Sequence, residues 1–225
     1  MGILRRIRAA FVALVYADHN RSRTVKTQVS ALLEKHCENG KVLNVGSGST
    51  RIHPQVINLD IEDGPNVDFV GSADSLPFES ECFDLIITQE AFEHIEQPQI
   101  ALKECYRVLK QGGAIYFQVP FIIGYHPGPT DFVRFTSEGV YQYLQNAGFQ
   151  VSRVDIAVGG ATGFYRIAVE FSAILFSGPV SFLYTPAKGL FALLFYPIKW
   201  LDFWFSLSPQ RDRIAGGYMA VGTKA

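Results

Sequence analysis

The fold is decided by the stretch Lys41-Val-Leu-Asn-Val-Gly-Ser-Gly-Ser-Thr50, which is followed shortly by Val56-Ile-Asn-Leu-Asp60. Each segment begins as a short apolar run, which predicts a buried strand. The first run ends in a glycine-serine loop, and the second ends in a carboxylate. Glycines let a ligand come close to the backbone, and a carboxylate one strand away can accept hydrogen bonds from both hydroxyls of a ribose. The two segments therefore predict a nucleotide pocket at the ends of neighbouring strands.

Apolar runs and helical patterns alternate along the rest of the chain. Further strands are expected at residues 67–70, 83–88, 114–119, 149–156 and 217–222. Helices are expected at residues 22–36, 98–110 and 136–147, the second ended by Gly112 and Gly113 and the third by Gly148. Strands that are apolar on both faces and separated by helices form a parallel sheet covered on both sides. We therefore expect an α/β, Rossmann-like, doubly wound fold with a mostly parallel, seven-stranded sheet.

Composition limits the class of protein. The chain has 225 residues, of which 48% are hydrophobic and 18% charged, and these values exclude a disordered chain. Its net charge of −1 argues against a protein that binds nucleic acid through bulk charge. The length suits one domain with appendages. We expect a core formed by residues 41–160 and 214–225, N-terminal amphipathic helices in residues 1–40, and an apolar helical insertion at residues 161–213.

The N-terminus indicates where the protein is found. Residues 1–16 combine an apolar helical stripe with Arg5, Arg6 and Arg8. This pattern favours a cationic amphipathic helix that remains on the chain over a cleaved signal peptide. The cysteines form no closely spaced pair, which favours a reducing compartment. We therefore expect a cytoplasmic protein at the inner face of a membrane, since basic residues are attracted to anionic lipids.

The insertion is unusually aromatic. Residues 164–207 carry thirteen aromatic residues and only five charged ones. Because Gly178-Pro179 interrupts the apolar run, a membrane-spanning helix is not expected. Tryptophan and phenylalanine settle at the headgroup level of a bilayer, so peripheral membrane contact through residues 1–16 and 164–207 is one interpretation. The alternatives are that the insertion covers the sheet as core or forms a homodimer interface.

Three further motifs follow the first two segments in order. They are Ala73-Asp74-Ser-Leu76-Pro-Phe78, then Phe83-Asp84 with Glu90-Ala-Phe-Glu-His94, and then Arg107-Val-Leu-Lys-Gln-Gly-Gly113. Over residues 41–158 and 217–222 the chain resembles the class I S-adenosylmethionine (SAM)-dependent methyltransferases. The resemblance implies an enzyme that binds SAM as its cofactor and transfers the methyl group of SAM to an acceptor.

The resemblance also assigns cofactor-binding roles. Gly46 and Gly48 would lie against the amino-acid part of SAM, and Asp60 would bind the ribose hydroxyls. Asp74 with Leu76 would frame the adenine, and Gln89 would lie near the methionine end and the sulfonium. Ala73 is also expected to bind the cofactor.

The chain departs from the family's pattern in three ways. Asn44 stands where the family usually has an acidic residue, and Thr50 takes the place of a third glycine. Asn44 can still form a hydrogen bond with the cofactor, but it offers no charge to its ammonium group. Only ten residues separate Val45 from Val56, whereas a parallel crossover usually takes a dozen or more. The early connections are therefore shorter than usual.

A polar loop follows the fifth expected strand, where the family places its acceptor. The stretch from His126 to Thr136 resembles a subgroup often associated with bacterial surface-glycan synthesis. We expect His126 as a general base and His94, Asp131 and Arg134 as substrate-binding residues. The alternatives are a proline-rich turn with a local Asp131–Arg134 ion pair, and a structural or helix-capping His94. A metal site made of His94, His126 and Asp131 is disfavoured, so no metal is expected.

Two functions follow from these features. The first is SAM-dependent methyl transfer, as an O-methylation of a small-molecule, glycan or lipid-linked acceptor. The second is a non-catalytic protein of the same fold that serves as a membrane-associated scaffold or partner. Asp60, Asp74 and the polar loop favour the enzyme, whereas Asn44 and the short connections favour the scaffold.

Overall fold

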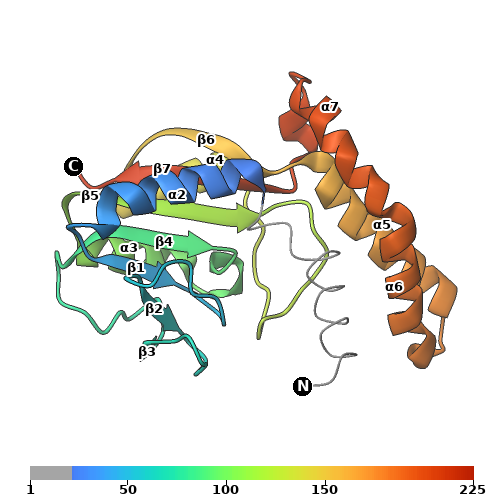
Figure 1. Ribbon diagram of the computed structural model, residues 1–225, viewed down its shortest axis with the longest axis horizontal. Helices are drawn as coiled ribbons and strands as arrows, with labels where there is room; N and C mark the ends of the chain where they lie inside the picture. Colours follow the sequence, from blue (N-terminus) through green and yellow to red (C-terminus); the bar gives the residue numbers. More distant parts are fainter. Residues whose placement is uncertain (1–21) are drawn as a thin grey trace. The chain divides into compact units, whose positions relative to one another are not determined.

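The structure, a computed structural model that describes residues 22–225, contains one sheet with the strand order β3-β2-β1-β4-β5-β7-β6 (Figure 1). Neighbouring strands from β3 to β5 are parallel. The strands are β1 Val42–Val45, β2 Ile57–Asp60, β3 Phe69–Val70, β4 Phe83–Gln89, β5 Leu109–Pro120, β6 Gln150–Val158 and β7 Gly217–Thr223. The helix expected in residues 1–16 lies outside the described residues.

The last strand runs against the others. The Phe121 N–H, at the end of β5, donates to the carbonyl of Gly216 at the start of β7 over 2.8 Å. At the other end of the pair, the Lys224 N–H donates to the carbonyl of Gly113 over 2.9 Å. A strand whose start pairs with its neighbour's end is antiparallel to it. The expected mostly parallel, seven-stranded Rossmann-like sheet is confirmed, with one antiparallel strand in it.

The short connections are held by polar side chains instead of a crossover helix. Arg51 donates from Nη1 to the carbonyl of Val56 over 2.9 Å, and from Nη2 to the carbonyl of Asn66 over 3.0 Å. Its guanidinium also lies 2.7 Å from a carboxylate oxygen of Asp68. The buried Asn58 amide donates to the carbonyls of Thr50 and Asn66 over 3.1 and 2.8 Å. These bonds hold the β1–β2 and β2–β3 connections, where a longer crossover would contain a helix.

The helices of the sheet begin and end as the sequence predicts, with one exception. They are α2 Arg23–Cys37, α3 Pro98–Val108 and α4 Ser137–Ala147. The Thr136 side chain accepts from the Gly139 N–H at the start of α4, and Gly148 ends this helix with a φ of 108°. The helix α2 packs on β1 and β4, whereas α3 packs on β5 and α4.

The exception is the end of α3, which was expected at Lys110. The helix ends at Val108, and β5 begins at Leu109, which pairs with Phe83 of β4. The Cys82 N–H donates to the carbonyl of Val108 over 2.9 Å, so backbone pairing with the sheet replaces the last helical bonds. Gly112, with a φ of 75°, therefore lies inside the strand and does not end the helix.

By its internal contacts the described chain divides into two units. We call residues 23–120, 126–155 and 218–225 the sheet unit, and residues 121–125 and 156–217 the helical unit. The helix α2, which was expected to form part of a separate segment of residues 1–40, belongs to the sheet unit. The insertion expected at residues 161–213 lies inside the helical unit.

The helical unit consists of α5 Gly160–Ser177, α6 Tyr184–Phe195 and α7 Asp202–Ser206, with short 3-10 turns between them. Buried side chains of Tyr165, Val169 and Ala192 join α5 to α6. Asp202 accepts from the Ala161 N–H over 2.7 Å and thereby caps α5. In the described part of the chain, no helix has the length and apolar character needed to cross a bilayer.

Candidate functional site

An open cavity of about 560 Å³ lies in the sheet unit, beside the carboxyl ends of β1, β2, β3 and β4. Parallel strands of an open α/β sheet bind their ligands at this edge. Six of the residues predicted from the sequence line the cavity, namely Gly46, Gly48, Asp60, Ala73, Asp74 and His94. The structure thus brings residues from two loops, the end of β2 and a 3-10 turn into one wall.

The glycine loop after β1 needs its glycines for different reasons. Gly46 and Gly48 have φ values of 72° and 52°, in the left-handed region that favours glycine. A Cβ atom on Gly46 would lie 2.2 Å from the Cβ atom of Ala91, whereas a Cβ atom on Gly48 would meet nothing within 4 Å. The loop therefore packs tightly at Gly46 and faces open space at Gly48, as a loop that cradles a ligand must.

Asp60 holds the glycine loop from the neighbouring strand. Its Oδ2 atom accepts from the Gly48 N–H over 2.6 Å, and its Oδ1 atom accepts from the Glu62 N–H over 3.1 Å. A carboxylate has about four acceptor positions, so each oxygen keeps one for a ligand. Because Asp60 lines the cavity, its carboxylate can accept hydrogen bonds from the two hydroxyls of a ribose. These residues fit a nucleoside-containing group.

Three other residues that the resemblance linked to the cofactor lie outside the cavity lining. The buried Asn44 side chain donates to Asn58 over 3.2 Å and thus joins the network that holds the short connections. Leu76 is buried in the sheet unit. Gln89 donates to Gln118 over 3.3 Å. Their roles toward a cofactor stay predictions, but the Asn44 contact explains why an amide suits this position.

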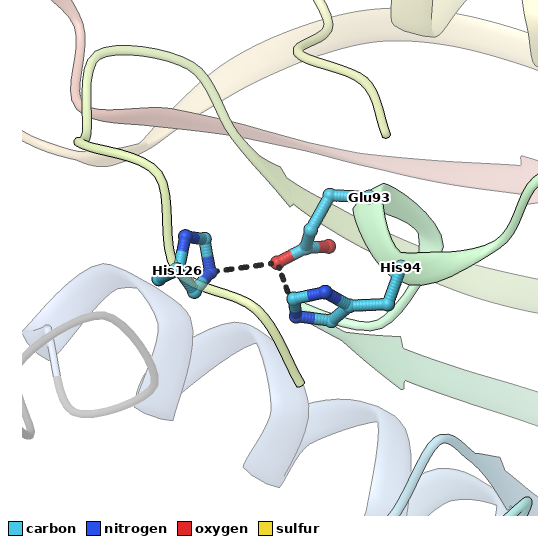
Figure 2. Close-up of side chains that lie close together, drawn as sticks. All are labelled: Glu93, His94 and His126. Carbon is cyan, nitrogen blue, oxygen red and sulfur yellow. Dashed lines mark ion pairs between the residues drawn. The ribbon is translucent and has the colours of Figure 1, made fainter. Parts of the chain in front are cut away.

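A cluster of Glu93, His94 and His126 lies next to the cavity (Figure 2). Glu93 and His94 belong to the 3-10 turn Phe92–His94, and His126 comes from the loop after β5. The Nε2 atoms of His94 and His126 lie 3.6 and 3.5 Å from the same carboxylate oxygen of Glu93. Sequence reasoning missed Glu93, because nothing in the pattern of residues 90–94 shows that the turn directs this carboxylate inward.

The Asp131–Arg134 pair shapes the loop that carries His126. Both terminal nitrogens of the Arg134 guanidinium donate to the Asp131 carboxylate, and the backbone N–H of His126 donates to it over 2.9 Å. Burial on its own would raise the pKa of Asp131, but the hydrogen bonds from Arg134 and His126 lower the pKa to about 2. The local ion pair considered from the sequence is therefore present, and it positions His126 from outside the cavity lining.

Comparisons with known proteins agree with this geometry. Residues 43–117 match the family model described as a methyltransferase domain. Over 77 residues the chain is 34% identical to the ubiquinone/menaquinone biosynthesis C-methyltransferase of Rhizobium meliloti, a match that covers 34% of this chain and 27% of that protein. The chain spans less than half the length of each curated relative that it matches.

Solved structures share the fold. The cyclase SpnF superposes with a TM-score of 0.54 at 17% identity, over 91% of this chain and 83% of that chain. Phosphoethanolamine N-methyltransferase 2 of Haemonchus contortus, solved with S-adenosyl-L-methionine, gives 0.53 at 15% identity, over 95% of this chain and 57% of that chain. The residues that match the methyltransferase family model thus form part of a Rossmann-like sheet. Since a cyclase has the same fold, the fold alone does not define the reaction.

Proposed function

We propose that the protein is a SAM-dependent methyltransferase. The observation that carries the proposal is the cavity wall in which the glycine loop, Asp60 and the Ala73–Asp74 segment come together. The match to a methyltransferase domain over residues 43–117 supports it. A non-catalytic scaffold is not favoured, because it would need neither the close packing at Gly46 nor a carboxylate on the cavity wall.

SAM would lie along this wall. Gly46 and Gly48 would hold its amino-acid part, Asp60 would accept from the ribose hydroxyls, and Asp74 would lie at the adenine. SAM supplies a methyl group on a sulfonium, which is already a good donor. The protein therefore has mainly to hold the acceptor in line with the methyl group, an effect worth roughly 7–11 kcal/mol at best.

The acceptor side of the proposal rests on the histidines. His94 is on the cavity wall, and His126 lies next to it outside the lining, with both imidazoles close to the Glu93 carboxylate (Figure 2). A hydroxyl acceptor needs a base, which adds roughly 10²–10⁴-fold to the rate. We propose an O-methylation with His126 as the base, and with a small-molecule, glycan or lipid-linked acceptor held by His94, Asp131 and Arg134. His126→Ala should then lower turnover while the affinity for SAM is kept.

Calorimetry tests the cofactor assignment. SAM and S-adenosylhomocysteine should each bind at one site per chain, and nicotinamide adenine dinucleotide should not compete. The two sulfur compounds share the adenosine and amino-acid parts that the wall is proposed to hold, whereas the dinucleotide lacks the amino-acid part. If the dinucleotide binds and neither sulfur compound does, the protein is a dehydrogenase and not a methyltransferase.

We further propose that the helical unit contacts the cytoplasmic face of a membrane. Three of its charged groups bond within the unit, since Lys188 binds Glu170 and Asp202 caps α5. Its large apolar side chains are instead exposed, including Phe171, Leu175, Phe176, Phe182, Leu194, Trp200, Phe203, Trp204 and Leu207. Soluble monomers rarely expose large apolar patches, and tryptophan prefers the headgroup region. A homodimer interface is the other way to cover this surface.

A further inference from the structure

The Glu93 carboxylate is buried without a hydrogen bond. Its side chain has no exposed surface, and within the part of the chain that the structure describes neither of its oxygens has a hydrogen-bond partner. A buried carboxylate that is neither hydrogen-bonded nor bound to a cation is costly. The residues around Glu93 should therefore supply a cation or hold one.

The two imidazoles face this carboxylate at a spacing that suits a shared ion. Their Nε2 atoms lie 3.6 and 3.5 Å from the Glu93 oxygen, and the three candidate ligand atoms all lie within 4.8 Å of one another. Ligand atoms held at about 2.0–2.1 Å from one tetrahedral ion lie about 3.4 Å apart. Small side-chain movements would therefore bring all three ligands onto one ion.

The hydrogen bonds of His94 direct its free nitrogen at Glu93. Its Nδ1 atom contacts the carbonyl oxygen of Thr130, which can only accept, so Nδ1 carries the proton. In the neutral imidazole of His94 the lone pair then lies on Nε2, which is 3.6 Å from a carboxylate oxygen of Glu93. A metal-binding histidine is usually oriented in this way, by a backbone carbonyl at its other nitrogen.

The ring of His126 has to exchange one partner before its Nε2 atom can bind a metal ion. Its Nδ1 atom lies 3.6 Å from a carboxylate oxygen of Asp131 and 3.2 Å from a guanidinium nitrogen of Arg134. The guanidinium can only donate, so Nδ1 accepts from Arg134 in this arrangement, and Nε2 becomes a metal ligand only when Nδ1 takes a proton and bonds to Asp131 instead. Arg134 is the nearby cation that opposes a metal ion, but Asp131 binds both of its terminal nitrogens and offsets its charge.

We propose that Glu93, His94 and His126 bind one divalent transition-metal cation of the zinc class. Two imidazoles and one carboxylate are a ligand set that zinc and related ions take, with a further coordination position left open. The binding does not depend on the proposed methyl transfer. If Nε2 of His126 is a ligand, it cannot also act as a base, so loaded and metal-free protein would differ in which group takes a proton.

Metal titration without SAM tests this proposal. After treatment with a chelator, the whole protein should bind one Zn²⁺ per chain in competition with a chromophoric chelator, and Co²⁺ in its place should give the visible absorption of a four-coordinate site. Glu93→Gln and His126→Ala should each weaken Zn²⁺ binding by about 100-fold or more, since each removes a direct ligand. His53→Ala is the matched control, because His53 lies outside the cluster and should leave the affinity unchanged.

Two outcomes would overturn the proposal. One is equal Zn²⁺ affinity in wild type, Glu93→Gln and His126→Ala; the other is no Zn²⁺ binding by folded wild type. Circular dichroism identifies a variant that fails to fold. If the buried Glu93→Gln variant does not fold, His126→Ala still tests the site, because the His126 side chain is 30% exposed. SAM calorimetry on the same samples is a separate readout, so failure of the cofactor assignment leaves the metal result standing.

Discussion

At the scale of single residues, the cavity depends on backbone that only glycine adopts readily and on one carboxylate that holds it. Gly46 and Gly48 both lie in the left-handed region, and Asp60 bonds to the second of them. Polar groups near the cavity also form hydrogen bonds with one another, since Asp131 accepts from the Arg134 side chain and from the His126 backbone N–H. Local bonds of this kind fix the positions of the groups that a ligand would meet.

Gly46→Ala and Gly48→Ala should differ in their effect on stability. A left-handed φ costs an alanine about 1–2 kcal/mol at either position. Only at Gly46 would the new methyl group also overlap Ala91, at 2.2 Å. Chemical denaturation should therefore show a larger loss of unfolding free energy for Gly46→Ala than for Gly48→Ala. Equal losses would mean that the loop does not pack on Ala91 as described.

Asp131 should make stability depend on acid pH. Its pKa is lowered from 3.8 to about 2 in the folded protein. A carboxylate with a lowered folded pKa stabilises the protein above its unfolded pKa and loses that contribution as the pH falls through the folded value. About 2 kcal/mol should therefore disappear between roughly pH 4 and pH 2.

The measurement is unfolding free energy against pH for wild type, Asp131→Asn and the control Asp63→Asn, an exposed aspartate outside this loop. Asp131→Asn should have a shallower slope than the other two in this range. The same slope in all three proteins would contradict the role given to the Asp131–Arg134 pair.

At the scale of elements, the strands and helices follow from apolar periodicity, because each buries a regular face. The cavity residues Gly46, Gly48, Asp60, Ala73 and Asp74 could also be placed from the sequence, since they come directly after predicted strands. The end of α3 could not, because the pairing of Leu109 with Phe83 is a tertiary contact that local pattern does not show. Glu93 was missed for a similar reason, since an irregular turn directs its side chain inward.

The short connections should depend on the fork of the Arg51 guanidinium. Arg51→Lys keeps the charge but cannot reach Val56, Asn66 and Asp68 together, because an ammonium is a single point donor. Hydrogen bonds to charged groups are each worth about 1.5–3 kcal/mol, so a loss in this range is expected. Denaturation of Arg153→Lys, an exposed arginine paired with Asp155, is the control and should change little. Similar stability of the two variants would show that the guanidinium does not hold the loops.

At the scale of the whole molecule, the sheet unit carries the cavity and the helical unit carries the exposed apolar surface. The aromatic composition of residues 164–207 could be read from the sequence, but its exposure could not, since an apolar segment is equally able to form core.

Membrane contact should be lost with the tryptophans. Full-length protein should sediment with anionic liposomes at low salt, and Trp200→Ser combined with Trp204→Ser should reduce the bound fraction several-fold, since each removes a large exposed apolar side chain. Tyr141→Ser, on α4 of the sheet unit, is the control and should bind as wild type does. If wild-type protein stays in the supernatant and is a dimer by size-exclusion chromatography, the exposed apolar surface of the helical unit is a dimer interface instead.

The measurement that tests the central claim most directly is the affinity for SAM of wild type, Asp60→Ala and the control Asp63→Ala by calorimetry, with circular dichroism to verify the fold. Asp60 is the carboxylate on the cavity wall, whereas Asp63 lies outside the lining. Hydrogen bonds to a charged acceptor are worth about 1.5–3 kcal/mol, so Asp60→Ala should weaken SAM binding by about 10- to 100-fold. Asp63→Ala should bind SAM as wild type does. An unchanged dissociation constant for folded Asp60→Ala, or no binding of SAM by wild type, would contradict the account.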